Sequence, residues 1–249
     1  MTDIITLEGI KQLLNNESFP IYVFKELDST NTFAKALADD CALVIAESQS
    51  AGRGRMGRSF FSPEGSGAYF SIKLQVPDLY QNVPFITTLA SVAVHKAAKE
   101  LYNKTCGIKW VNDVYLDNKK VSGILCESPD PSHVIIGIGI NVYPSAFPEE
   151  LESIATCLTD TAASVSRGDL IAHIAKSIIS MTNSLPDTSF MEYYKAHSIV
   201  IGKPVTFIMN GTAGSGIATD ITNEGALKVE TPNGIVTLST GEITLRFTD

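Results

Sequence analysis

The sequence changes character near Gly202, and this change constrains the fold more than any other feature. Before that point, segments with the apolar spacing of helices alternate with short runs that are typical of strands. The last 48 residues hold 7 of the 18 glycines, and Asn-Gly, Asn-Glu-Gly and Pro-Asn-Gly turns separate their short β-rich runs. We therefore predict two domains, residues 1–200 with mixed structure and residues 201–249 as a small all-β barrel or sandwich packed against the first.

The first domain is predicted to be α+β, with a mixed central sheet and flanking helices. Helices are expected at 7–15, after Asn31, at 84–102, from Ser166 onward and at 190–197. Strands are expected at 21–24, 42–47, 114–116, 121–126 and 133–142. Residues 68–76 alternate between apolar and polar side chains, which predicts a half-buried strand. Arg167 is expected to be solvated at the start of its helix, where 166–169 form a capping-box-like pattern.

Net charge and composition exclude several classes of function. The chain carries a formal charge of −8 and has a pI near 5.0, whereas bulk binding of nucleic acid needs a basic face. No apolar stretch reaches the ~18 residues of a membrane span, and the N-terminus lacks the pattern of a signal peptide. The four cysteines lie far apart without a CxxC motif, so we expect reduced thiols in a cytoplasmic protein. The four histidines are isolated in the sequence, so we predict no zinc site.

The arginines of this chain are concentrated in one loop. The chain has five arginines, and Arg53, Arg55 and Arg58 fall within six residues. Glycines at 52, 54 and 57 allow positive φ angles and bring backbone amides close to a ligand. Because guanidinium groups bind phosphate and carboxylate through paired hydrogen bonds, this loop is predicted to bind an anion. The alternatives are a flexible surface loop and an RNA contact, and the acidic charge of the chain disfavours RNA.

Two motifs near the middle of the chain combine lysine with other polar groups. Lys109, Asn112 and Asp113 flank Trp110, the only tryptophan, which can stack on a ring but more often packs in a core. Asp113 can orient a cation or hold a metal ion through a phosphate. In residues 119–127, a lysine that precedes a strand can reach a bound anion, although two solvated turn lysines would have the same pattern.

Two other motifs indicate close approach of a small ligand. Gly137 and Gly139 interrupt a β-branched strand before Asn141, and glycines weaken a strand, so they suggest that a ligand or another backbone comes near. The segment Asp28–Asn31 offers short hydroxyl groups and an amide that can bind a polar molecule. The same residues can cap a helix, and both functions are compatible.

In this order, the motifs resemble those of the biotin–protein ligase family. The resemblance extends from about Tyr22 to Phe247, and its most specific parts are the arginine–glycine loop and the Lys-Trp-x-Asn-Asp segment. It implies a class II synthetase-like catalytic domain and a C-terminal SH3-like barrel. It also implies that biotin reacts with MgATP to give biotinyl-5′-AMP and pyrophosphate. A lysine of a biotin carboxyl carrier domain then attacks the acyl adenylate.

The resemblance assigns roles to individual residues. Lys120, Arg55 and Arg53 would be catalytic, because cationic groups must hold two anions that repel each other. The set implied for biotin is Ser29, Thr30, Asn31, Gln49, Gly52, Arg53, Gly54, Arg55, Lys120 and Gly123. The set implied for ATP and the adenylate is Arg53, Arg55, Arg58, Phe60, Lys109, Trp110, Asn112, Asp113, Lys120 and Asn141. Asp113 would also face Mg²⁺ through the phosphates, and the loop from 52 to 58 would close over the adenylate and exclude water.

The sequence departs from the family pattern at two positions. Val111 stands where many members have proline, and Met56 stands where the loop often has a fourth arginine, so one anion contact is in doubt. Some members carry an N-terminal helix-turn-helix domain and repress transcription. The 27 residues before Asp28 are too few for that domain, so we expect a ligase without repressor function.

Two alternative functions remain open from sequence. A lipoate–protein ligase shares the fold and the adenylate chemistry, although the arginine–glycine loop and the C-terminal barrel favour biotin. A non-catalytic adenylate-binding protein would keep the pocket and lack turnover. The expected partners are therefore biotin, ATP and the carrier domain, with no nucleic acid and no membrane, and a homodimer is left open.

Overall fold

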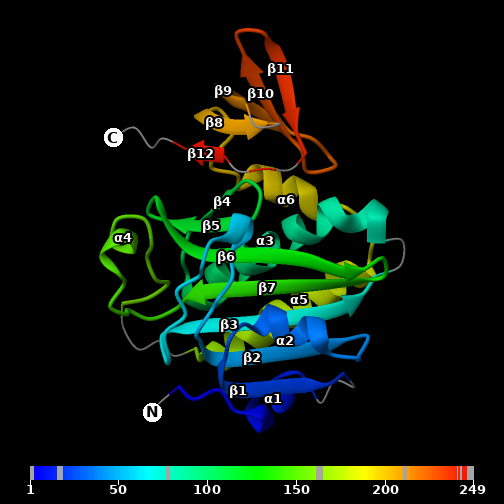
Figure 1. Cartoon of the computed structure of the whole chain (residues 1–249), viewed down its shortest axis with the longest axis vertical. Coiled ribbons are helices and arrows are strands. Elements are labelled where there is room, and N and C mark those ends of the chain that lie inside the picture. The colour runs from blue at the N-terminus through cyan, green and yellow to red at the C-terminus, as the bar shows by residue number, and fades with distance from the viewer. Residues whose placement is uncertain are drawn as a thin grey trace.

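The protein has a large part built on a seven-stranded sheet and a smaller β part that lies against it (Figure 1). A computed structural model describes residues 3–15, 19–76, 79–160, 165–209, 212–239, 241 and 243–245. The strands of the large sheet are β1 (Ile21–Leu27), β2 (Ala42–Gln49), β3 (Gly67–Gln75), β4 (Gly107–Lys109), β5 (Asp113–Leu116), β6 (Lys119–Asp130) and β7 (His133–Asn141). Their order is β1-β2-β3-β7-β6-β5-β4. Strands β1 and β2 are parallel and all other neighbours are antiparallel, which confirms the mixed central sheet.

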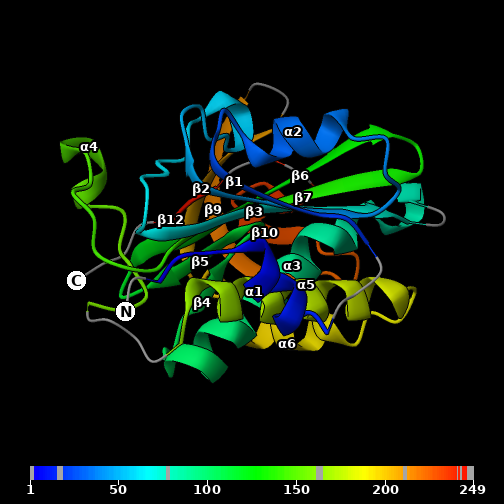
Figure 2. The ribbon, with the colours of Figure 1, turned by 90° about the horizontal axis from the view of Figure 1, so that it is seen from below.

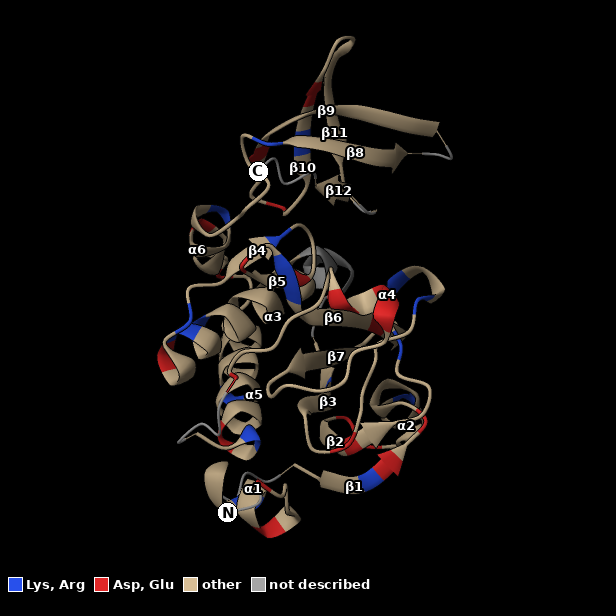
Figure 3. Cartoon of the chain, turned by 90° about the vertical axis from the view of Figure 1, so that its left-hand side faces the viewer, with Lys and Arg blue, Asp and Glu red and all other residues tan. Residues whose placement is uncertain are grey.

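Helices cover both faces of this sheet (Figure 2). One face carries α2 (Thr30–Ala36), which lies in the crossover that two parallel strands require. The opposite face carries α1 (Leu7–Leu13), α3 (Leu79–Tyr102), α5 (Arg167–Asn183) and α6 (Phe190–Ala196). Helix α3 begins at Leu79, five residues before the predicted start at Pro84. The short helix α4 (Glu149–Glu152) carries three glutamates at one end of the sheet (Figure 3).

Strand β3 is buried on both faces, which corrects the expectation of a half-buried strand. Its polar residues Tyr69, Ser71 and Lys73 are only 1%, 0% and 5% exposed, because α2 and the loop after β2 cover their side of the sheet. Each of them has a polar partner. The Lys73 ammonium donates to the carbonyl oxygen of Leu37 at 2.7 Å, and the Tyr69 hydroxyl donates to that of Pro63 at 3.1 Å. The alternating residues of β3 therefore face two buried layers. The apolar side chains pack on one face of the sheet, the polar side chains lie on the other, and neither face of this strand is exposed to solvent.

Arg167 is fully buried at the start of α5, which corrects the expectation that it is solvated. Its guanidinium donates to a Glu47 carboxylate oxygen at 2.7 Å and to the carbonyl oxygen of Gly67 at 3.1 Å. It also contacts the carboxylate and the carbonyl of Asp3. The other Glu47 oxygen accepts from the amide of Ile5 at 2.9 Å. Arg167 therefore fastens the N-terminal segment to β2, and the helix start still carries the complete capping box that the sequence predicted.

The smaller part is one antiparallel sheet of five strands. They are β8 (Pro204–Met209), β9 (Thr212–Ile221), β10 (Leu227–Thr231), β11 (Gly234–Leu238) and β12 (Ile243–Leu245), in the order β11-β10-β9-β8-β12. Within the described residues β11 and β12 do not pair, so the sheet is not closed into a barrel. Glu242 and Arg246 lie outside the described residues. The two parts share one hydrophobic core, and the indole nitrogen of Trp110 donates to the carbonyl oxygen of Gly225 at 2.9 Å.

All four cysteines lie in the described part of the chain, and none of them forms a disulfide bond. Burial raises the pKa of the Cys106 thiol to about 11. In the part of the chain that the structure describes, none of the helices combines the length and the apolar character needed to cross a bilayer.

His95 joins α3 to α6 and to the segment that leads into β4. Its side chain is 1% exposed, with Nδ1 3.0 Å from the hydroxyl oxygen of Tyr193 and Nε2 2.8 Å from the carbonyl oxygen of Cys106. The ring of His197 lies beside it, with 4.5 Å between the ring centroids. Burial, together with the nearby His197 and Lys99, lowers the pKa of His95 below its ordinary value. His95 is therefore a core histidine that is uncharged near neutral pH.

We expect the free energy of unfolding to fall as the pH is lowered from about 7.5 to about 5.5, and His95→Gln to reduce that fall. Because the pKa of His95 is lower in the folded protein, the unfolded chain binds the proton more tightly. Its contribution to stability is therefore present above the unfolded-state pKa and is lost as the pH falls through it. Urea unfolding at both pH values measures the effect. The control His173→Gln changes a partly exposed histidine and should not reduce the fall; equal pH dependence in His95→Gln and the unmodified protein would contradict the prediction.

Candidate active site

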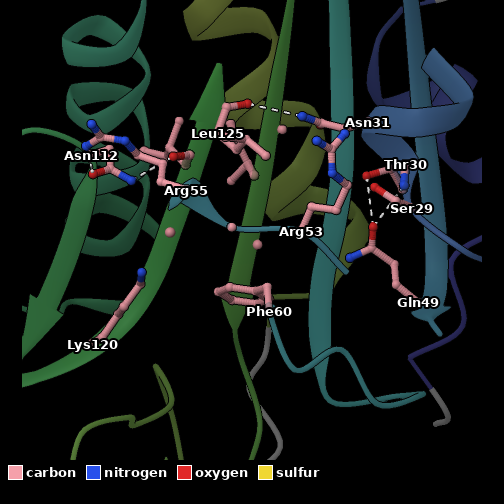
Figure 4. Close-up of a pocket in the computed structure, with 16 residues that line it drawn as sticks. Ser29, Thr30, Asn31, Gln49, Arg53, Arg55, Phe60, Asn112, Lys120 and Leu125 are labelled. Atoms are coloured by element: carbon pink, nitrogen blue, oxygen red, sulfur yellow. Dashed lines mark hydrogen bonds between the residues drawn. The ribbon is translucent and has the colours of Figure 1, made fainter. Parts of the chain in front are cut away.

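Two adjacent pockets lie on the side of the central sheet that carries α2. The first pocket is lined by Ser29, Thr30, Asn31, Gln49, Arg53, Gly54, Arg55, Phe60, Asn112, Lys120, Gly123, Ile124, Leu125, Gly137, Ile138 and Gly139 (Figure 4). The second is lined by Gly54, Arg55, Met56, Arg58, Ser59, Phe60, Lys109, Trp110, Asn112, Asp113, Lys120 and Ile243. Five residues are common to both, and two of these, Arg55 and Lys120, are cationic. Molecules bound in the two pockets would therefore meet beside a shared pair of positive charges.

The structure brings most of the predicted site residues to these pockets. Of the set expected for biotin, all line the first pocket except Gly52, whose missing side chain lets the backbone of Phe60 come close. Of the set expected for ATP, all line the second pocket except Arg53, which lines the first, and Asn141. Asn141 lines neither pocket, and its amide donates to the carbonyl oxygen of Thr156 at 3.1 Å. Trp110 is 3% exposed, so its indole forms part of the core as well as part of the wall.

One end of the first pocket is a buried group of polar side chains at the start of α2. Ser29 caps the helix by accepting from the amide of Thr32. The amide of Thr30 donates to Gln49 Oε1 at 2.9 Å, and both Thr30 and Asn31 are 4% exposed. Figure 4 shows Ser29, Thr30 and Gln49 side by side at this end. Since each side chain is held by a neighbour, their donors and acceptors have fixed directions and can select a small polar ligand.

The two glycines of β7 make room for side chains of the site. A Cβ atom on Gly137 would overlap Asn31 Oδ1, and one on Gly139 would overlap the ring of Phe60. These side chains belong to α2 and to the segment after the arginine–glycine loop, so the glycines determine how closely both elements sit on the sheet. Both glycines also line the first pocket, and the close approach of a ligand that the sequence motif suggested stays a prediction.

The arginine–glycine loop is tied to both parts of the protein. Arg55 donates to Asn112 Oδ1 at 3.0 Å and to the carbonyl oxygen of Gly241 at 2.8 Å, across the second pocket. Arg53 forms an ion pair with Glu127. Met56, where a fourth arginine is common, has a φ of 56° and a side chain that is 78% exposed. The loop therefore places two guanidinium groups over the pockets and points Met56 outward.

Lys120 and Asp113 form a close ion pair at the wall between the pockets. The Lys120 ammonium lies 2.7 Å from a carboxylate oxygen of Asp113. A two-residue turn, in which Asp117 and Asn118 both have positive φ angles, joins β5 to β6 and brings the pair together. Gly123 lies beside the ammonium, which a side chain at that position would crowd. The turn that the sequence predicted therefore places Lys120 in the lining of both pockets.

Sequence reasoning missed Ser71, which is 0% exposed beneath the first pocket. Its hydroxyl oxygen lies 2.6 Å from Asn31 Oδ1 and 2.8 Å from Thr30 Oγ1. In the sequence Ser71 is one of the alternating polar residues of 68–76, so nothing there distinguishes it from a serine that faces water. No cluster of three or more histidine, cysteine, aspartate or glutamate side chains is arranged to hold a metal ion among the described residues.

Comparisons with known proteins agree with this fold and site. Residues 23–141 match the Biotin/lipoate A/B protein ligase family, and residues 200–246 match the Biotin protein ligase C terminal domain. The solved structure of the biotin protein ligase from Aquifex aeolicus in complex with biotin and ATP is 28% identical and has a TM-score of 0.80. The alignment covers 92% of this chain and 99% of that one. The fold and the paired pockets thus define the class of biotin and lipoate protein ligases.

Two curated relatives narrow this class. The bifunctional ligase/repressor BirA of Bacillus subtilis is 37% identical over 88% of this chain and 72% of its own length. The biotin–[acetyl-CoA-carboxylase] ligase of Mycobacterium tuberculosis is 31% identical over 82% of this chain and 79% of its own length. The chain belongs to the biotin–protein ligase family, which confirms the resemblance found in its sequence.

Proposed function

We propose that this protein activates biotin with ATP and transfers the biotinyl group to a lysine of a biotin carboxyl carrier domain. The observation that carries the proposal is the pair of adjacent pockets with Arg55 and Lys120 in their common wall. One pocket is rich in fixed polar groups and suits the biotin head group, whereas the other is basic and suits the nucleotide. Their common wall is where the biotin carboxylate and the α-phosphate would meet.

In the first step, a carboxylate oxygen of biotin attacks the α-phosphorus of ATP. The new bond joins that oxygen to phosphorus, the bond from the α-phosphorus to the bridging oxygen breaks, and pyrophosphate leaves. Lys120 and Arg55 hold the two anions together and stabilise the charge that develops between them. Ser29, Thr30, Asn31 and Gln49 orient the head group from the other end of the pocket.

Magnesium enters the proposal only through the phosphates of ATP. Mg²⁺ commonly keeps several waters and binds substrate phosphates with one or two carboxylates, so a cluster of acidic side chains is not required. Asp113 is the carboxylate in the lining of the second pocket. It would hold the ion, which when bound neutralises phosphate charge.

In the second step, the ε-amine of the carrier lysine attacks the acyl carbon of biotinyl-5′-AMP. A carbon–nitrogen bond forms, the bond from the acyl carbon to the phosphate oxygen breaks, and AMP leaves. Water would compete with the amine for the adenylate. The loop from 52 to 58 is proposed to exclude water, and the contacts of Arg55 with Asn112 and Gly241 support this role.

The finer features expected from the resemblance are part of the same proposal. They are a class II synthetase-like domain over residues 1–200, an SH3-like barrel over 201–249 and a cytoplasmic location. The position of β8, which begins at Pro204, supports the boundary between the two domains.

One assay tests the proposed function. The protein is incubated with labelled ATP and either biotin or lipoate, and then with a biotin carboxyl carrier domain. We expect biotin-dependent release of pyrophosphate and transfer of biotin to the carrier lysine. Release with lipoate alone would indicate a lipoate–protein ligase, and binding of adenylate without transfer would indicate a non-catalytic protein. Either outcome would refute the proposal.

Gly137→Ala is expected to weaken biotin binding by about ten- to a hundredfold. The new methyl group would overlap Asn31 Oδ1, so the amide must move and leave buried polar groups without partners. Isothermal titration calorimetry with biotin measures the dissociation constant. Gly168→Ala, in α5, is a matched control because its methyl group would make only ordinary contacts. If the dissociation constant of Gly137→Ala for biotin is within about threefold of that of the unmodified protein, Asn31 can move without weakening biotin binding, and the prediction is wrong.

A further inference from the structure

Glu127 connects the arginine–glycine loop to the polar group at the start of α2. It lies on β6, two residues beyond Leu125, and its side chain is 21% exposed. One carboxylate oxygen accepts from Asn31 Nδ2 at 2.9 Å and from an Arg53 guanidinium nitrogen at 3.2 Å. The other lies 3.2 Å from the second terminal nitrogen of Arg53. A single carboxylate thus holds a loop cation and a pocket amide.

The carboxylate also sets the direction of the hydrogen bonds behind the pocket. Because Glu127 can only accept, Asn31 must turn its NH₂ group toward Glu127 and its carbonyl oxygen Oδ1 toward Ser71. The hydroxyl oxygen of Ser71 lies 2.6 Å from Asn31 Oδ1 and 2.8 Å from Thr30 Oγ1, and the hydroxyl of Thr30 in turn donates to Gln49 Oε1 at 3.2 Å. The carbonyl oxygen of Leu125 also accepts from Asn31 Nδ2, at 3.3 Å (Figure 4), so Glu127 and the backbone of its own strand together orient Asn31, one of the residues proposed to bind biotin.

Folding stability alone does not account for this arrangement. The Arg53 side chain is 46% exposed, and ion pairs this accessible to water contribute little to stability. Glu127 uses only two of the five N–H donors of the guanidinium, so Arg53 can bind a substrate anion without leaving it. The contact therefore holds Arg53 over the pocket before an anion arrives.

We propose that Glu127 is a positioning residue for biotin binding, an inference that rests on the proposed function. It acts through Arg53 and Asn31 and does not itself line the pocket. It orients the Asn31 amide for the biotin head group and holds the Arg53 guanidinium beside that amide, because one Glu127 oxygen accepts from both. Its effect belongs to the binding of biotin more than to the chemical step, because the biotin carboxylate and the α-phosphate would meet at the other end of the pocket, beside Arg55 and Lys120.

Two substitutions separate the charge of Glu127 from its ability to accept a hydrogen bond. Glu127→Gln keeps an acceptor for Asn31 and removes the charge beside Arg53, so we expect the dissociation constant for biotin to rise about threefold. Glu127→Met removes both, and we expect a rise of about tenfold or more. At saturating biotin, the rate of pyrophosphate release should fall less than about threefold in both variants, a split that general loss of structure would not produce.

A double-mutant cycle tests whether the effect passes through Asn31. In an Asn31→Ala background, Glu127→Met should raise the dissociation constant by no more than about threefold, the part that passes through Arg53, because the Asn31 amide is already absent. The control Glu64→Gln makes the same change of charge in an exposed pair with Lys25 and should bind biotin normally. Thermal unfolding checks each variant, and Glu127→Gln, the nearly isosteric one, keeps the test informative if Glu127→Met does not fold.

The outcomes distinguish this inference from the proposed function. If the unmodified protein releases pyrophosphate with biotin but Glu127→Gln and any folded Glu127→Met bind biotin normally, the positioning role is overturned and the proposed function stands. Additive effects of Asn31→Ala and Glu127→Met would also overturn it. If the unmodified protein shows no biotin-dependent release, the proposed function itself fails.

Discussion

Replacing Lys120 with alanine is expected to slow adenylate formation by about two to three orders of magnitude. Lys120 lies in the wall that both pockets share, where the biotin carboxylate and the α-phosphate would meet. The substitution removes one positive charge from the site. It also removes the ammonium that lies 2.7 Å from the Asp113 carboxylate, so that this carboxylate would repel the phosphates. Biotin-dependent release of pyrophosphate at saturating biotin and ATP measures the rate.

The neighbouring lysine provides the matched control. Lys119→Ala makes the same change of charge one residue away, but the Lys119 ammonium donates to the carbonyl oxygen of Glu152 at 2.8 Å and does not line either pocket. We expect Lys119→Ala to retain a rate within about threefold of the unmodified protein, as surface changes usually have small effects. If Lys120→Ala retains the full rate, Lys120 is not catalytic.

Arg167→Ala is expected to lower the free energy of unfolding by about 3–5 kcal/mol. The substitution removes the cation that neutralises Asp3 and Glu47 and leaves two partly buried carboxylates without it. It also opens a space at the start of α5, since Arg167 is the largest of the fully buried side chains. Urea unfolding followed by circular dichroism measures the change.

Lys176→Ala is the control for this second prediction. Lys176 lies on the exposed side of the same helix, α5, and loses the same charge. We expect it to change the free energy of unfolding by no more than about 0.5 kcal/mol. An effect of Arg167→Ala below about 1 kcal/mol would mean that water or another cation replaces the guanidinium.

Most of the fold could be predicted because its elements have strong local patterns. Some structures are determined by a few neighbouring residues and can be predicted from them. Examples are the capping box at Ser166, the turn at Asp117 and Asn118, and the glycine-rich turns after Gly202. Burial of Arg167 could not be predicted in this way. Its partners Asp3 and Glu47 lie 164 and 120 residues away in the sequence, so nothing local marks the position.

The candidate site shows the same limit. The arginine–glycine loop and the segment from Lys109 to Asp113 were found because their residue types are unusual at such close spacing. Ser71 and Glu127 were not found as site residues, because each owes its role to Asn31, which lies on a different element. A serine or a glutamate in a strand has many ordinary explanations, and only the assembled sheet shows which side chains face each other.

The bond from Arg55 to Gly241 has a consequence for the order in which the enzyme becomes competent during synthesis. The two residues are separated by 186 positions, and Ile243 of the second pocket follows Gly241. A growing polypeptide on the ribosome can therefore form the strands of the central sheet before the second pocket has its last wall. Because domains generally fold as units from the N-terminal end, the contact that holds Arg55, which lines both pockets, would form last. Reactive adenylate would then form only after the C-terminal strands have emerged and docked.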